Sequence, residues 1–367
     1  MRQRVAEAFP PGDFIREEME ERGWSQLDLA QILDLQPAAL NLVIAGRRKV
    51  TPELAQRLED AFGPSAQYWM NLQTIFDLWN AGDRTHGVAR RAKIFAKAPI
   101  RDMIKRGWIE PSDNIDVLEK RVCDFFCIDS IDDEPRLGYA AKTSVQIQTP
   151  THRAWLFRAK QLAKSISATR FEKKNLGQCL ARLRLLMQDP EETRHASKTL
   201  AEYGIRLVIV EQLPKTKIDG ALFWLDATSP VIALSLRYDR IDWFWQALGH
   251  ELGHLDKGHV EAFDVELDKN VQDDAKERTA NAFAQALSIP EDELDGFIAR
   301  VKPLYSHSRI SGFANRLGIH PGIVVGQLQF RGELGYSHSR KFLVPIRRFV
   351  VPSTLTDGWG ALLPASM

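Results

Sequence analysis

Apolar residues recur at helical spacing through the first eighty positions of the chain, and residues suited to helix ends separate them. Ser25 and Thr51 are favourable N-caps, Pro37 suits a first helical position, and Gly23 and Gly46 suit the residue after a helix. These capping residues predict five short helices, over residues 12–24, 26–33, 38–45, 53–62 and 65–78.

Residues 81–203 also show amphipathic helical periodicity, but they carry no chemical motif. Apolar stripes such as Trp155, Leu162 and Ile166 are typical of helices that pack on a core. Loop-forming residues dominate from Asp129 to Thr149. The predicted helices cover residues 88–97, 100–107, 118–126, 151–168, 175–188 and 190–203.

After Gly204 the pattern changes to short β-branched runs, which are typical of strands. A small antiparallel or mixed sheet is expected, and one of its edge strands could hold an extended peptide by backbone hydrogen bonds. Helices follow, with a charged loop between Glu261 and Asp274. The predicted fold class is therefore α+β, predominantly α. Its strands cover residues 205–210, 221–225 and 231–236, and its helices 242–255, 277–289, 291–301, 310–317 and 321–329.

Length and composition narrow the classes of protein. At 367 residues two or three domains are expected, and 49 basic against 48 acidic residues are typical of a soluble globular protein. We expect a cytoplasmic protein, because no apolar run is long enough to cross a bilayer and the N-terminus lacks a signal-peptide core. Three cysteines make no disulfide framework, so Cys123 and Cys127 are expected to be small core residues.

The stretch from Gln246 to Leu255 contains one motif with a defined chemistry, His250-Glu251-Leu252-Gly253-His254. Histidines four apart share one helix face, so both imidazoles can bind one metal ion. Zinc accepts such nitrogens and keeps an open position in catalytic sites, while Glu251 could accept a proton from the attacking water. This H-E-x-x-H pattern is typical of zinc peptidases, although it also occurs by chance in helices that bind no metal.

A third ligand is expected from the next helix. Glu277 lies on the side of that helix where apolar residues recur, one turn before Ala280. A carboxylate facing a core needs a partner, and a metal ion is a good one. The alternative is a first-turn glutamate stabilised by a salt bridge and the helix dipole. Other candidates for the third ligand are His259, Asp264 and Asp268.

The motif His250-Glu251-Leu252-Gly253-His254, followed by Glu277-x-x-Ala280-Asn281-x-Phe283-Ala284, resembles the ImmA/IrrE family of metallopeptidases. The resemblance implies a zincin-like domain that binds Zn²⁺ through His250, His254 and Glu277, with Glu251 as the base. One departure is the pair Leu248-Gly249, where bulkier residues are expected. The hydrophobic wall behind the metal is therefore expected to be looser.

Two short helices joined by a tight turn within the N-terminal bundle form a helix-turn-helix pattern. Ser25-Gln26-x-x-Leu29-Ala30 and Ile44-x-Gly46-Arg47-Arg48 resemble the Xre/lambda-repressor class. The run Phe62-Gly63-x-Ser65-x-x-x-Trp69-x-Asn71-Leu72-Gln73 is similar to its HigA antitoxin branch. The resemblance implies that this domain binds operator DNA.

Few residues of the second helix could read bases. Gln36 and Asn41 could pair with adenine, and Arg47, Arg48 and Lys49 could hold phosphates. Because residues 1–80 are net acidic, DNA affinity would have to be local or come from a homodimer. The alternative is a helix-turn-helix kept for protein docking or dimerisation.

The last part of the chain holds a second helix-turn-helix-like pair, from Ile310 to Gln329. The run from Ile319 to Gln329 resembles the C-terminal part of ImmA/IrrE proteins, which implies packing on the peptidase domain rather than on DNA. Candidates to stabilise a developing oxyanion are His320, as a catalytic residue, and His307 and Tyr305. A histidine at a helix start is otherwise a cap or a core residue. The basic, partly apolar tail is expected to add a strand or bind a partner.

We therefore expect a helix-turn-helix domain over residues 1–80, a helical linking or partner segment over 81–203, a metallopeptidase-like domain over 204–335 and a tail over 336–367. The leading hypothesis is a DNA-binding regulator with a zinc-dependent peptidase domain that cleaves a regulatory protein, such as a repressor. The alternative is an antitoxin-like repressor that binds operator DNA and a HigB-like toxin, with a non-catalytic metal site. A third hypothesis, a sensor whose middle helices enclose a metabolite, has no cofactor motif behind it.

Overall fold

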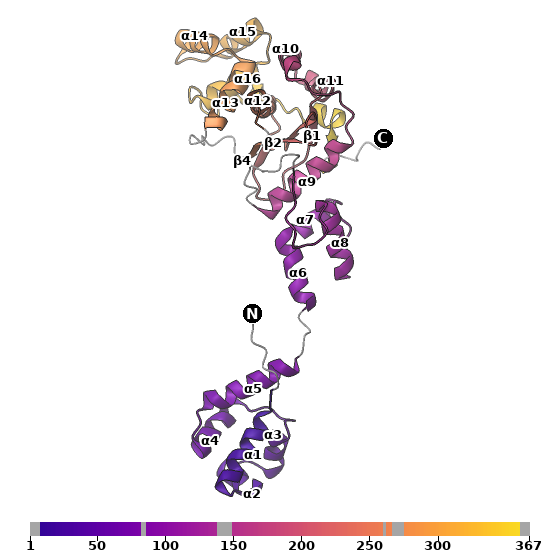
Figure 1. Cartoon of the computed structure of the whole chain (residues 1–367). Helices are drawn as coiled ribbons and strands as arrows, with labels where there is room; N and C mark the ends of the chain where they lie inside the picture. Colours follow the sequence, from indigo (N-terminus) through magenta and orange to yellow (C-terminus); the bar gives the residue numbers. More distant parts are fainter. Residues whose placement is uncertain (1–7, 82–85, 138–148, 260–261, 266–274, 360–367) are drawn as a thin grey trace. The chain divides into compact units, whose positions relative to one another are not determined.

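A computed structural model describes residues 8–81, 86–137, 149–259, 262–265 and 275–359 of the chain. It divides into two compact units, residues 1–89 and 90–367, which are described separately (Figure 1). The predicted boundaries at residues 203/204 and 335/336 fall inside the second unit and stay predictions. Within the described residues no single helix is long and apolar enough to span a membrane.

The N-terminal unit is a bundle of five helices around one core. Leu29, Leu40, Leu58 and Trp69 are fully buried in that core. The second and third helices meet at 110°, which is the angle of a helix-turn-helix. The helices are α1 (Pro11–Arg22), α2 (Gln26–Ile32), α3 (Pro37–Ile44), α4 (Pro52–Phe62) and α5 (Ala66–Asn80).

The predicted helix ends of this unit are confirmed by their hydrogen bonds. Ser25 and Asp28 form a capping box, in which each side chain accepts from the other residue's backbone N–H. Thr51 Oγ1 accepts from the backbone N–H of Leu54 at 3.3 Å. Gly46 ends the turn after α3 with a φ of 67°, a conformation that favours glycine.

The C-terminal unit is built on a five-stranded sheet in the order β4-β2-β3-β1-β5. The sheet is mixed, which is one of the two types that the sequence predicts. Of the three inner strands, β2 and β3 pair antiparallel, whereas β3 and β1 pair parallel. Along β1, Leu207 and Ile209 face one apolar cluster while Val208 faces the other, so both sheet faces are covered. The strands are β1 (Arg206–Ile209), β2 (Ile218–Trp224), β3 (Pro230–Leu234), β4 (Ala262–Val265) and β5 (Leu355–Thr356).

Helices that precede the sheet in sequence and helices that follow it bury its two faces. On one face, α9 (Pro150–Lys164) packs on β1 and β3, and α6 (His86–Lys97), α7 (Ile100–Lys105) and α8 (Ile115–Phe126) belong to the same apolar cluster. Residues 90–203 therefore contribute to both apolar clusters of this unit's core. The other face packs against α10 (Leu176–Leu185), α11 (Ala196–Glu202), α12 (Ile241–Lys257), α13 (Ala275–Ser288), α14 (Glu291–Val301), α15 (His307–Leu317) and α16 (Pro321–Phe330).

Two sequence predictions are wrong in detail. The charged segment from Glu261 to Asp274 is not loop throughout, because residues 262–265 form the edge strand β4, paired antiparallel with β2. Cys127 is not a core residue: it is exposed and ends α8 in a left-handed conformation with φ 54°. Helical spacing places Cys123 and Cys127 one turn apart, but the chain leaves the helix at the second cysteine, which removes it from the buried face.

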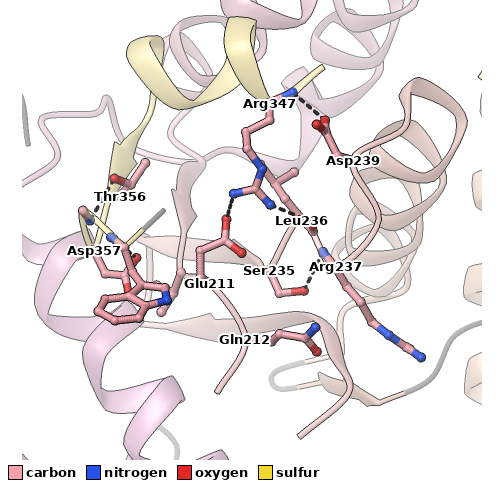
Figure 2. A network of polar contacts seen from close by, with 12 residues as sticks. Glu211, Gln212, Ser235, Leu236, Arg237, Asp239, Arg347, Thr356 and Asp357 are labelled. Atoms are coloured by element: carbon pink, nitrogen blue, oxygen red, sulfur yellow. Dashed lines mark hydrogen bonds and ion pairs between the residues drawn. The ribbon is translucent and has the colours of Figure 1, made fainter. Parts of the chain in front are cut away.

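The C-terminal tail adds a strand to the sheet, which is one of the two expectations from the sequence. β5 pairs parallel with β1 and covers that edge of the sheet. Figure 2 shows how the segment before β5 is tied down: the Arg347 guanidinium contacts Glu211 and its backbone N–H donates to Asp239 at 2.7 Å. Arg106 pairs with the buried carboxyl group of Asp357 at 3.3 Å. The β1 edge is therefore closed to a peptide, and β4 is the other edge.

The three cysteines should differ in reactivity. Burial raises the pKa of Cys179 to about 12, so almost none of it is thiolate at about pH 8. Cys123 is also buried and burial raises its pKa, whereas Cys127 is exposed. We expect a disulfide reagent to titrate one thiol rapidly in the native protein and the other two only after unfolding. Rapid reaction of two or three thiols would contradict the packing around α8 and α10.

Candidate metal centre

The motif helix α12 begins after β3 and a short turn, as predicted, and its motif face is buried. His250 is fully buried and His254 is 1% exposed, which is unusual for two histidines on one helix. Their ring centroids lie 4.7 Å apart because they are separated by one helical turn. α12 therefore holds both imidazoles in fixed positions inside the unit.

Three ligand-type atoms converge at this place. The Nε2 atoms of His250 and His254 are 3.0 Å apart, and the Glu277 carboxylate is 3.1 Å from the first and 3.5 Å from the second. Two atoms that each bind a tetrahedral zinc at about 2.1 Å lie about 3.4 Å apart. The three distances bracket that value, so His250, His254 and Glu277 fit a zinc ion.

The outer nitrogens of both imidazoles have their own partners. His250 Nδ1 lies 2.9 Å from Asn281 Oδ1, and His254 Nδ1 lies 2.7 Å from His259 Nδ1. An amide oxygen can only accept, so His250 carries a proton on Nδ1, and its Nε2, which faces Glu277, is the nitrogen that would bind a metal. Partners of this kind orient histidine ligands in metal sites.

Asn281 and His259 were not predicted in these roles. The sequence signal for Asn281 is its position, four residues after Glu277 on the same face of α13. His259 was considered only as a third ligand, and the structure places its ring against His254 instead. Of the other two candidates, Asp268 lies outside the described residues, and for Asp264 only the backbone in β4 is described.

The Glu277 carboxyl group stays ionised at this site. Burial by itself raises the pKa of Glu277, but its contacts with the imidazoles of His250 and His254 hold that pKa well below its ordinary value. The side chain is 25% exposed, so the group is open to solvent on one side. A carboxylate with two imidazoles gives a site with three protein ligands and room for a fourth, as in catalytic zinc sites.

Glu251 is fully buried next to this group, on the side of the sheet. A Cβ atom at Gly220 in β2 would lie 2.3 Å from Glu251 Oε1. Any side chain at position 220 would therefore displace the carboxylate. The strand supplies the space in which Glu251 sits, which the motif alone does not reveal.

The two glycines of the motif helix have a packing role that corrects one expectation. A Cβ at Gly249 would lie 3.1 Å from Ala284 Cα, and one at Gly253 would lie 3.0 Å from Ala280 Cα. Small residues on both helices therefore let α12 and α13 pack closely. The expected looser wall behind Leu248-Gly249 is wrong, because a missing side chain is compensated by a closer helix.

The three residues predicted to stabilise an oxyanion contact other parts of the C-terminal unit rather than the metal group. His320 is the N-cap of α16: its Nδ1 accepts from the backbone N–H of Gly322 at 3.0 Å, and burial lowers its pKa. Tyr305 donates to Glu333 at 2.8 Å, and the His307 ring packs edge-on against Phe342. A catalytic role for His320 stays a prediction, since its described contacts are those of a helix cap.

The predicted DNA contacts all lie on the surface around α3. Gln36 is exposed at the N-cap of α3 and Asn41 within the helix, and the loop that follows exposes Arg47, Arg48 and Lys49. Lys49 forms an ion pair with Asp77 at 2.7 Å, which a phosphate would have to displace. Such an exposed pair is weak, so this contact does not prevent DNA binding.

Comparison with known families divides the chain in the same way. Residues 15–69 match the family described as "Helix-turn-helix". Residues 201–324 match the family described as "IrrE N-terminal-like domain", a span that contains His250, Glu251, His254 and Glu277. The two resemblances inferred from the sequence are thus confirmed at the level of the family.

The relatives cover the N-terminal part. The uncharacterised HTH-type transcriptional regulator YddM of Escherichia coli is 32% identical over 84 residues, 23% of this chain and 88% of its own. Virulence-associated protein I of Dichelobacter nodosus is 39% identical over 72 residues, 19% of this chain and 67% of its own. The solved Pseudomonas aeruginosa antitoxin HigA with higBA promoter is 31% identical, over 22% of this chain and 87% of its own, with a TM-score of 0.21. The chain therefore belongs to the helix-turn-helix family of transcriptional regulators, and it joins such a domain to an IrrE N-terminal-like domain.

Proposed function

We propose that this regulator binds operator DNA through its N-terminal unit and that its C-terminal unit is a zinc-dependent peptidase. The peptidase proposal rests on the convergence of His250, His254 and Glu277, with Glu251 buried beside them. A structural zinc site is usually closed by four protein ligands, whereas three ligands with a neighbouring carboxylate favour catalysis.

The residues of the chain have distinct roles in peptide hydrolysis. When bound, zinc would polarise the scissile carbonyl and lower the pKa of the attacking water. Glu251 accepts the proton of that water and returns it to the leaving amine. Asn281 and His259 hold the imidazoles in orientation. The edge strand β4, at the opposite side of the sheet from the edge that β5 covers, is available to pair with an extended substrate backbone.

The substrate we propose is a specific regulatory protein, such as a repressor, rather than polypeptides in general. A helix-turn-helix domain in the same chain supports this, because it would hold the peptidase at a promoter where such proteins bind. A homodimer on a two-fold operator would place two such domains on adjacent half-sites.

Metal analysis tests the site directly. We expect about one zinc per chain in the purified protein, and loss of that zinc in His254→Ala, because one of three protein ligands is removed. The measurement is elemental analysis of the full chain, with zinc affinity by competition against a chelator. His195→Ala is the matched control, since His195 is half exposed and pairs with Glu192 away from the motif helix. Zinc retained in His254→Ala would contradict the ligand assignment.

DNA binding is tested with paired arginine variants. Arg47→Ala with Arg48→Ala should weaken binding to DNA from the chain's own promoter uniformly across sequences, and should lower the salt slope by about two. The measurement is fluorescence anisotropy at several salt concentrations. Arg16→Ala is the control, because Arg16 is an exposed arginine on α1 that pairs with Asp13. An unchanged salt slope would favour a docking or dimerisation role for this domain.

The second candidate function is an antitoxin-like repressor that binds a toxin, with a metal site that is not catalytic. It is favoured by the run from Phe62 to Gln73, where Trp69 is buried and Gln73 accepts from the backbone N–H of Val50 at 2.9 Å. These residues build the core of the N-terminal unit, as the resemblance to the HigA branch implies. Operator binding that survives chelation, with no cleavage of any partner, would support this candidate.

A further inference from the structure

A pocket of about 400 Å³ lies at the N-terminal end of the motif helix, lined by residues of α12, α13 and α16. Figure 1 shows these three helices in the C-terminal unit. Its volume lies within the range of pockets that hold small molecules. None of the residues that line it belongs to the metal group. They include Trp243 and Gln246 from α12, Gln285 and Ser288 from α13, and Gln327 and Phe330 from α16.

One buried polar side chain of this pocket, Gln327, has an unused hydrogen-bond acceptor. Gln327 is 6% exposed, and its Nε2 donates to the Gln285 carbonyl at 3.0 Å and to Ser288 Oγ at 3.2 Å. Its Oε1 is buried and accepts no hydrogen bond from the described residues. Because a buried amide oxygen normally has a partner, this atom calls for a donor from whatever fills the pocket.

The charges that line the pocket cancel. Asp242 is 7% exposed and accepts from two nitrogens of Arg240, at 3.0 and 2.6 Å. Its carboxylate is fixed against Gly326, where a Cβ would lie 2.5 Å from Asp242 Oδ2. A paired aspartate does not need a cation, so the pocket suits a neutral ligand.

The remaining walls favour a flat ligand. Trp243 is held in place by its Nε1, which donates to Asp219 at 3.3 Å, and Phe330 and Tyr336 add aromatic surface. Gln246, Gln285 and Gln327 bring three side-chain amides to one space, and each amide can both donate and accept. Glutamine pairs in this way with the donor and acceptor edge of a purine, while aromatic rings stack on its face.

We propose that this pocket binds a neutral molecule of the nucleobase or nucleoside class. An N–H or amino group of the base donates to Gln327 Oε1, and the ring stacks against the aromatic wall. The pocket begins one helical turn from the metal group, since Gln246 precedes His250 by four residues and Gln285 follows Asn281 by four. The ligand would therefore lie next to the candidate catalytic site, in the same seam between α12 and α13.

Titration of the full chain with adenosine, guanosine, cytidine and uridine tests this. Calorimetry should show binding of at least one nucleoside with a Kd below about 1 mM, one molecule per chain. Gln327→Leu, which removes the amide, should weaken that binding by about tenfold. Tyr336→Ala is a second variant that keeps the fold, because Tyr336 is 66% exposed, and it should also weaken binding.

Leu185→Ala is the matched control, an exposed apolar residue outside the pocket, and it should leave the nucleoside Kd unchanged. The proposal is wrong if no nucleoside binds below about 1 mM, or if both pocket variants bind as tightly as the wild type. It is also wrong if only a glutamine-containing peptide binds there, since the pocket would then recognise a substrate side chain. Binding is measured without turnover, so these outcomes do not depend on whether the peptidase assignment holds.

Discussion

Glu251→Gln is expected to abolish peptide cleavage while leaving zinc in place. The substitution keeps the shape of a fully buried side chain but removes the group that accepts a proton from the attacking water. General bases of this kind contribute about 10²–10⁴-fold, so the rate should fall by that factor. The measurement is cleavage of a candidate repressor, or of the chain itself, followed by gel and mass spectrometry alongside zinc content.

A second variant tests the role of Glu251 by changing the strand residue next to it. Gly220→Ala places a Cβ where Glu251 Oε1 now lies, and the flexible carboxylate must move away from it. Cleavage should fall here too, with zinc content and thermal stability close to wild type. Cleavage at the wild-type rate in Glu251→Gln would refute the base assignment. Loss of zinc in that variant would show that Glu251 acts as a ligand.

Gly253→Leu is expected to destabilise the C-terminal unit and to lower its zinc affinity. A Cβ at this position already lies 3.0 Å from Ala280 Cα and 3.1 Å from Ala280 O, which are backbone atoms that cannot turn aside. The larger side chain must push α13 away from α12, and Glu277 moves with α13. Overpacking of this kind costs about 1–3 kcal/mol of unfolding free energy. Denaturant unfolding with and without zinc measures both effects.

Gly312→Leu is the control for that experiment. Gly312 is also a helical glycine, in α15, but it is exposed and a Cβ there meets nothing within 4 Å. The same glycine-to-leucine change should leave zinc affinity unchanged and stabilise the helix slightly, because leucine is the better helix former. Equal zinc affinity in both variants would mean that the close packing of α12 and α13 does not position Glu277.

Much of the local structure could be predicted, because it depends on neighbours in sequence. The capping box at Ser25 and the helix end at Gly46 follow from residue types at fixed spacing. The mixed sheet followed from its β-branched runs, but its order did not, since pairing between distant strands is not encoded in either strand alone. The strand at residues 262–265 was missed because the segment around it, from Glu261 to Asp274, is rich in charged residues and resembles a loop.

The sequence by itself determined the chemistry of the metal group: two histidines one turn apart, and a glutamate on the facing side of the next helix. Only the tertiary structure decided that these atoms meet, because the distance from His250 to Glu277 depends on how closely α12 and α13 pack. The same holds for Gly220, Asn281 and Gln327, whose roles arise from contacts with residues far away in the chain. A motif fixes which groups are available, whereas packing between distant segments fixes where they lie and what they can bind.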